Sequence, residues 1–223
     1  MERDVERQLA FYLRRLEREQ SGQNHPLIIA DNASVIARCY EILGQQEEAG
    51  QYFRISADAC VQALPEQLLR MKRPHERGRE TLNCGRTLWW ARDDRASQYF
   101  LQTLRVLEEC SGEPTLEWRL HCVTLASIAS LFMEDYAQAR DAIDQAMDLR
   151  EMSTVPKAGP DLVLLIESVL EACELGTVEG LRGALSKIED YRRAGQESLI
   201  SARPGYGVDL REFVRRKLAS AQV

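Results

Sequence analysis

Residues 33–56 decide the predicted fold: Ala33-Ser-Val-Ile-Ala-Arg-Cys-Tyr-Glu-Ile-Leu-Gly44 is followed directly by Gln45-Gln-Glu-Glu-Ala-Gly-Gln-Tyr-Phe-Arg-Ile-Ser56. The first half carries a small residue, Ala37, with Tyr40 about one turn further along. The second half carries Ala49, Phe53 and Ser56 at helical spacing. Because a glycine separates the two periodic segments, the pattern predicts a pair of helices joined by a short turn.

The same register recurs twice further along the chain, in the order small, alanine, bulky, small. The second copy has Cys84, Ala96, Phe100 and Thr103, and the third has Ser127, Ala139, Ile143 and Ala146. Bulky pairs also precede each turn, at Ile42-Leu43, Trp89-Trp90 and Phe132-Met133. Three copies in one register predict a helical repeat architecture.

These positions resemble the signature of tetratricopeptide repeats. In that family the small residues let two helices approach closely, and the bulky residue fills the gap between them. The resemblance implies an all-α, right-handed solenoid of antiparallel hairpins whose first helices line a concave groove. The copies lack the Gly and Trp of the family pattern, and their alanines are spaced more widely than the family period of about 34 residues. A HEAT-like period of about 40–47 residues is the alternative.

The remaining segments extend the predicted stack into one helical-repeat domain over residues 1–223. We expect an N-terminal capping helix at 1–20, hairpins at 27–63, 75–111, 115–151 and 161–194, and a last amphipathic helix at 208–221. Loops rich in Pro and Gly are predicted at 152–160 and 203–207. Asp161 is a predicted helix start, and Gly176 is the predicted turn of the fourth hairpin. A single hairpin cannot bury its apolar face alone, so the units are expected to stack.

Composition and charge narrow the class of protein. The chain is 44% hydrophobic and 29% charged, which fits a globular protein with a sizeable core. A net charge of −6 argues against a general nucleic-acid binder. The charged first residues do not resemble a signal peptide, and no apolar run is long enough to span a bilayer. We therefore expect a cytoplasmic protein with no membrane partner.

The cysteines and histidines suggest neither a metal site nor a cofactor. Cys39, Cys60, Cys84, Cys110, Cys122 and Cys173 form no C-x-x-C pair, and His25, His75 and His121 form no ligand motif. Reduced, structural thiols are the first interpretation, and disulfides in a secreted protein are the alternative. No nucleotide-binding or hydrolase signature is present, so we expect no catalytic residues. The Asp93-Asp94 pair is interpreted as a helix cap.

The resemblance places candidate partner-binding residues on the first helix of each pair. The candidate groove consists of Asp31, Ser34, Arg38, Glu41, Thr81, Leu88, Trp89, Trp90, His121 and Thr124. Ile128 and Leu131 share this register, but burial is their expected fate. Adjacent tryptophans point about 100° apart, so at least one ring is expected in the core. In the alternative interpretation, the N- and C-terminal helices fill the groove and leave no open surface.

A basic patch is a second candidate site. It consists of Arg70, Lys72, Arg73, Arg77 and Arg79. A basic cluster can dock phosphates or an acidic partner. The alternative is a solvated linker whose arginines pair with Glu66, Glu76 and Glu80, and the absence of interleaved aromatic residues weakens an RNA interpretation.

Taken together, these features predict a non-catalytic module that binds another protein or a peptide, such as a bacterial immunity protein or an adaptor. The alternatives are a peptide- or ligand-responsive regulator and, less favoured, an enzyme on a helical scaffold. Phe213, Val214 and Leu218 form an apolar stripe on the last helix. This stripe predicts either a homodimer or docking of the last helix on the fourth hairpin.

Overall fold

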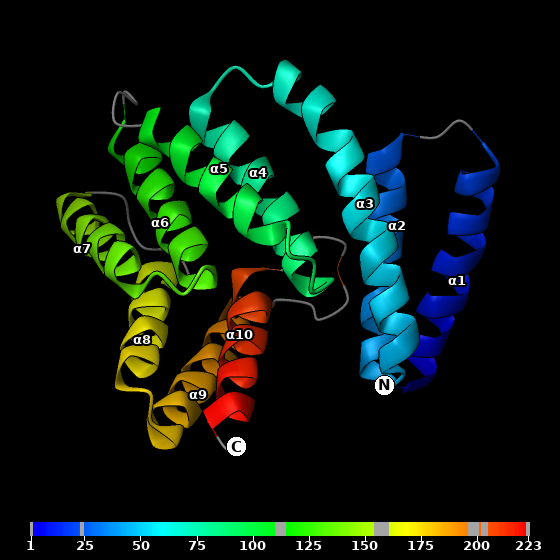
Figure 1. The fold of residues 1–223 in the computed structure, drawn as a ribbon. Helices are drawn as coiled ribbons and strands as arrows, with labels where there is room; N and C mark the ends of the chain where they lie inside the picture. Colours follow the sequence, from blue (N-terminus) through cyan, green and yellow to red (C-terminus); the bar gives the residue numbers. More distant parts are fainter. Residues whose placement is uncertain are drawn as a thin grey trace. The chain divides into compact units, whose positions relative to one another are not determined.

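The computed structural model describes residues 2–22, 25–109, 115–153, 161–195, 201 and 205–221. The described residues form ten α-helices and no strand. In chain order these are α1 (Glu2–Ser21), α2 (Pro26–Ile42), α3 (Gln46–Arg70), α4 (Pro74–Trp90), α5 (Ala96–Glu108), α6 (Leu116–Phe132), α7 (Tyr136–Met152), α8 (Leu162–Leu175), α9 (Val178–Gly195) and α10 (Tyr206–Ala221) (Figure 1). The all-α prediction and its sequence of hairpins are confirmed. Most of the two predicted loops, at 152–160 and 203–207, lies outside the described residues.

The helices pack mainly on their neighbours in the chain. α1 packs on α2 and α2 on α3, while α6 to α10 form a second series in which each helix contacts the next. The described chain divides into two compact units. The first unit contains residues up to 72 and 80–99, and the second contains residues 73–79, 100–195 and 205–221 where these are described. A single domain over 1–223 therefore stays a prediction.

The predicted register is the packing register of the hairpins. All twelve residues of the three-copy register are buried, and Ala37, Cys84, Ser127 and Ile143 have no exposed surface. The other eight buried positions are Ala49, Phe53, Ser56, Ala96, Phe100, Thr103, Ala139 and Ala146. The Ser56 hydroxyl donates a 2.8 Å hydrogen bond to the carbonyl oxygen of Ala30, so the small residue brings α3 directly against the backbone of α2.

The first three hairpins also close with the same turn. Gly44, Arg92 and Glu134 all have positive φ, at 78°, 56° and 62°. The N–H of the residue after each of them bonds the carbonyl five positions back, as from Gln45 to Tyr40 and from Asp93 to Leu88. This hydrogen bond is that of the Schellman motif at the end of a helix, which favours glycine at the left-handed position. The repeat is therefore visible in the backbone as well as in the side chains.

We expect Arg92→Gly to raise the free energy of unfolding by up to about 1 kcal/mol, because glycine adopts the left-handed conformation without steric cost. The Arg92 side chain is exposed, so little packing is lost. Gly44→Ala should lower stability by a similar amount, and nothing lies within 4 Å of the added methyl group to complicate the comparison. Urea unfolding of both variants measures the effect; a loss of stability in Arg92→Gly would contradict it.

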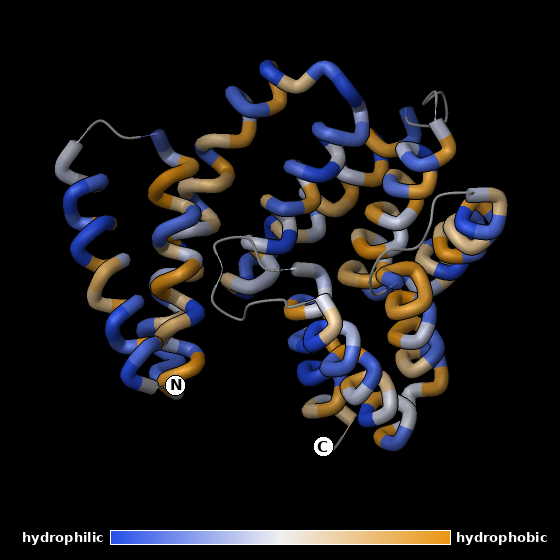
Figure 2. Tube along the Cα trace, turned by 180° about the vertical axis from the view of Figure 1, so that it is seen from behind, coloured by the Kyte–Doolittle hydropathy of each residue, from blue (hydrophilic) through white to orange (hydrophobic). Residues whose placement is uncertain are grey.

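The terminal helices are fixed by their apolar faces. In α1, Val5 and Leu16 are buried, and Val5 joins Val35 and Cys39 in one apolar cluster, whereas hydrophilic residues cover most of the rest of the helix (Figure 2). In α10, Phe213 and Val214 are buried and the helix packs on α8 and α9. The stripe on the last helix thus docks within the chain, and a homodimer stays a prediction.

Three helix boundaries can be compared with the boundaries predicted from the sequence. Asp161 caps α8 by accepting the N–H groups of Val163 and Leu164, and Gly176 ends the helix at φ 62°, both as predicted. The second helix of the first pair was predicted to end at residue 63, which is wrong: α3 continues through Pro65 to Arg70. Burial of Leu64 and the Glu66–Arg70 ion pair hold the extra turns despite the amide hydrogen that proline lacks.

Candidate functional site

The predicted groove residues divide between the two units. Asp31, Ser34, Arg38 and Glu41 lie on α2, Thr81, Leu88, Trp89 and Trp90 on the first-unit part of α4, and His121 and Thr124 on α6 in the second unit. Ser34, Arg38, Thr81, Leu88, Trp90 and Thr124 are buried, and Asp31, Glu41, Trp89 and His121 are half-buried. The six buried side chains contribute to packing and are not exposed for a partner. Ile128 and Leu131 are buried, as expected.

Within the first unit, the structure brings Arg38 and Trp90 into contact. The Arg38 guanidinium lies 4.2 Å from the Trp90 ring centroid and 5.6 Å from that of Phe53, and the two rings stack at 5.4 Å. Arg38 is only 2% exposed. The contact between α2 and α4 therefore occupies part of the predicted groove face, and the expectation that one tryptophan is in the core is confirmed for Trp90.

The basic patch is partly neutralised by ion pairs. Arg70 pairs with Glu66, as the solvated-linker interpretation predicts, and Arg77 pairs with Glu109 at 2.6 Å. Lys72, Arg73 and Arg79 are exposed. Because Arg70 and Lys72 belong to the first unit and the other three to the second, a single basic surface stays a prediction.

An aromatic–histidine cluster in the second unit was not found from the sequence. The buried His75 ring stacks on Trp118 at 4.0 Å, His121 lies edge-on to His75 at 6.5 Å, and Arg73 lies 5.7 Å from the Trp118 centroid. An aromatic ring is thus present beside the basic residues, although it comes from α6. Burial, followed by the charges of His75 and Arg79, lowers the pKa of His121.

This cluster predicts a loss of stability in mild acid. The pKa of His121 is lower in the folded protein than in the unfolded chain, so the unfolded chain binds the proton more readily below about pH 6.5. Stability should therefore fall as the pH drops from 7.5 to 5.5, and less steeply in His121→Gln. Urea unfolding across this pH range measures the difference. If the free energy of unfolding changed equally with pH in the two proteins, His121 would not be the cause.

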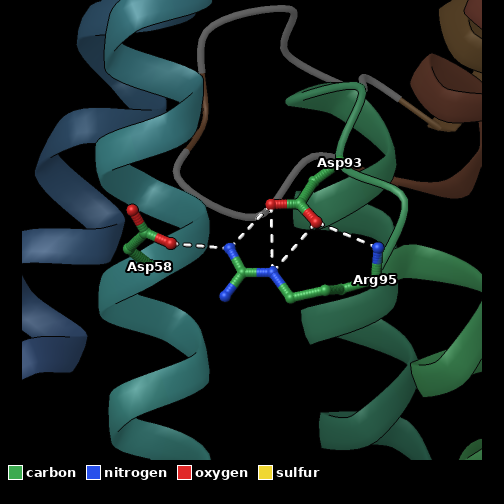
Figure 3. Close-up of polar contacts among 3 residues, drawn as sticks. All are labelled: Asp58, Asp93 and Arg95. Carbon is green, nitrogen blue, oxygen red and sulfur yellow. Dashed lines mark hydrogen bonds and ion pairs between the residues drawn. The ribbon is translucent and has the colours of Figure 1, made fainter.

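An ion-pair network joins α3 to the turn before α5. Arg95 donates to Asp58 on α3 at 2.6 Å and to Asp93 at 2.6 Å (Figure 3). The hydrogen bond from Arg95 is the main cause that lowers the pKa of Asp93. Asp93 also accepts the backbone N–H of Arg95 at 2.9 Å, which agrees with its predicted role at a helix start.

A pocket of about 430 Å³ lies between α5, α6 and α7 in the second unit. Its floor is apolar, with Leu104, Leu107, Cys122 and Leu149 buried beneath it. The remaining lining residues are Glu108, Arg119, Val123, Ala126, Gln138, Asp141, Ala142 and Gln145. From α6, Arg119, Cys122, Val123 and Ala126 line this pocket, whereas the predicted positions His121 and Thr124 do not.

The pocket was missed because it is built from three helices of two successive hairpins. Leu104 and Leu107 come shortly after Phe100, the bulky residue of the second copy, and Ala142 comes directly before Ile143, that of the third. Each of these apolar residues, taken alone, is typical of a buried helix face. Only the exposed charges among apolar neighbours, Glu108, Arg119 and Asp141, gave a signal that sequence reading could have used. The arrangement suits an apolar side chain flanked by charged groups.

Two further findings bear on the class of site. In the described part of the chain, no three His, Cys, Asp or Glu side chains are grouped so as to hold a metal ion, and no helix there is long and apolar enough to cross a membrane. Comparison with family models, curated proteins and solved structures finds no match to this chain. Any functional proposal therefore depends on the geometry of the molecule itself.

Proposed function

We propose that this chain is a non-catalytic module that binds a protein or peptide, and that the pocket between α5, α6 and α7 receives a basic, amphipathic helix of the partner. The observation that carries the proposal is the pocket itself, with its apolar floor beneath charged rim residues. Helical grooves commonly take the apolar face of an amphipathic helix. A volume of about 430 Å³ suits the few side chains that one face of a short helix presents.

The charge around the pocket supports a basic partner. Asp141, Asp144 and Asp148 are exposed along one face of α7, and Glu108 adds a fourth carboxylate from α5. The two arginines of α7 form ion pairs with other carboxylates: Arg140 with Glu174 and Arg150 with Asp161. Arg119 is the one basic residue that lines the pocket. Complementary charge of this kind favours partner choice and association rate.

The test uses a synthetic peptide of about 14 residues, with leucines at i, i+3 and i+7 of a helix and lysines elsewhere. The charge control is the same peptide with glutamates in place of the lysines. Fluorescence anisotropy should show binding of the lysine peptide alone. Equal binding of both peptides, or of neither, would overturn the proposed partner.

Variants place the binding at the pocket. Ala142→Phe fills the pocket and should weaken binding at least about tenfold, whereas Ala10→Phe makes the same substitution at an exposed position of α1 and should have no effect. Asp141→Lys should also weaken binding, and Glu6→Lys, with the same charge change on exposed α1, should not. Equal effects within either pair would place the interaction elsewhere.

Narrower forms of the proposal differ in the partner. A tight, stable complex with one basic protein supports toxin neutralisation or an adaptor role. Reversible binding of short peptides, accompanied by a change in hydrogen exchange over α5–α7, supports the regulatory alternative.

A further inference from the structure

Two thiols of the first unit touch each other although they are far apart in the sequence. Cys60 lies on α3 and Cys84 on α4, two helices in contact through the stacked rings of Phe53 and Trp90. The side chains of the two cysteines are within hydrogen-bonding reach of each other. Neither cysteine forms a disulfide, and Cys84 is fully buried whereas Cys60 is half-buried. Cys60 is therefore the more accessible residue of the pair.

The surroundings of the pair are polar on one side. Arg95, which Asp58 and Asp93 hold in place (Figure 3), is close enough to favour a negative charge on Cys84. The hydrogen bond from Cys60 and burial outweigh this effect and raise the pKa of Cys84. Burial raises the pKa of Tyr99, and the charge of the two cysteines adds to the effect, which places this phenol near them. The Cys84 thiol is thus protonated at neutral pH.

We propose that Cys60 and Cys84 are an oxidation site, at which a peroxide converts the two thiols into a disulfide between α3 and α4. The half-buried Cys60 loses its proton, attacks one peroxide oxygen and becomes a sulfenic acid, while the O–O bond breaks and water leaves. The Cys84 sulfur then attacks the Cys60 sulfur, and the hydroxyl leaves as a second water with the Cys84 proton. Two thiols and one hydrogen peroxide thus give one disulfide and two waters.

The geometry also determines what the link does. The bond would enclose residues 61–83 and tie the first hairpin covalently to α4, within the first unit. Closing a loop of this kind restricts the unfolded chain. The disulfide would therefore resist separation of α3 from α4. The oxidation site does not depend on the peptide pocket.

The experiment treats the full chain with excess hydrogen peroxide, blocks remaining thiols with iodoacetamide, and maps the digest by mass spectrometry. We expect one dominant cross-linked peptide pair, containing Cys60 and Cys84 and lighter by two hydrogen atoms than the reduced pair. The same treatment in urea should abolish this preference, because the fold brings the two thiols together. A dominant link between other cysteines, or sulfinic acid at Cys60 without a link, would overturn the proposal.

Three variants complete the test. Cys60→Ser and Cys84→Ala should each remove the cross-link, and Cys84→Ala should keep the fold because the equivalent position of the first copy is Ala37. Cys173→Ser replaces a thiol that is half-buried like Cys60 and should leave the cross-link unchanged. Circular dichroism of each variant shows that loss of the link is not loss of the fold. A cross-link that persists in folded Cys84→Ala would exclude this pair.

Discussion

Phe100→Ala should lower the free energy of unfolding by about 3–5 kcal/mol, the range for removing a buried aromatic side chain. Phe100 is 1% exposed and stacks on Phe132 at 5.7 Å, and Phe132 in turn contacts Phe213 of α10 at 5.4 Å. Removing this ring leaves a cavity between two hairpins and the last helix. The effect should therefore reach beyond the hairpin that contains it.

Urea unfolding followed by circular dichroism measures this change, and native-state hydrogen exchange shows whether α5–α7 and α10 lose protection together. Phe11→Ala is the matched control, because the Phe11 ring is 54% exposed and its removal should change stability little. Equal effects of the two substitutions would mean that Phe100 does not seal the seam between the hairpins.

Ser56→Leu should have the second large effect, a loss of about 2–4 kcal/mol. Ser56 is 1% exposed, and its hydroxyl bonds the Ala30 carbonyl across the first hairpin. Leucine removes this hydrogen bond, worth about 1 kcal/mol, and forces apart helices that pack closely, which costs about 1–3 kcal/mol more.

Ser56→Ala separates the two contributions, since it removes the hydrogen bond without adding volume and should cost only about 1 kcal/mol. Ser186→Leu makes the same substitution at an exposed position of α9 and should be close to neutral. If Ser56→Leu were no more harmful than Ser56→Ala, close approach of α2 and α3 would not depend on a small residue at this position.

The helix pairs and their internal register could be read from the sequence because the signals are local. Apolar and small residues three or four positions apart share one helix face, so Ala37, Phe53 and Ser56 were expected on the packed faces of their hairpin, and all three are buried. Caps are equally local, as at Asp161 and Gly176. Arg92 and Glu134 show where this approach ends, since neither residue signals the left-handed turn that it occupies.

The sequence by itself therefore determined the all-α architecture, the hairpins and the residues that seal each of them. Only the tertiary structure decided which helices cover which faces: Arg38 is buried against Trp90, Cys60 meets Cys84, and a pocket opens between α5, α6 and α7. The physical reason is the distance along the sequence over which each kind of contact is specified. Periodicity specifies the face that a helix turns to its own partner, whereas contacts between successive hairpins depend on turn geometry and side-chain volume summed over the whole stack.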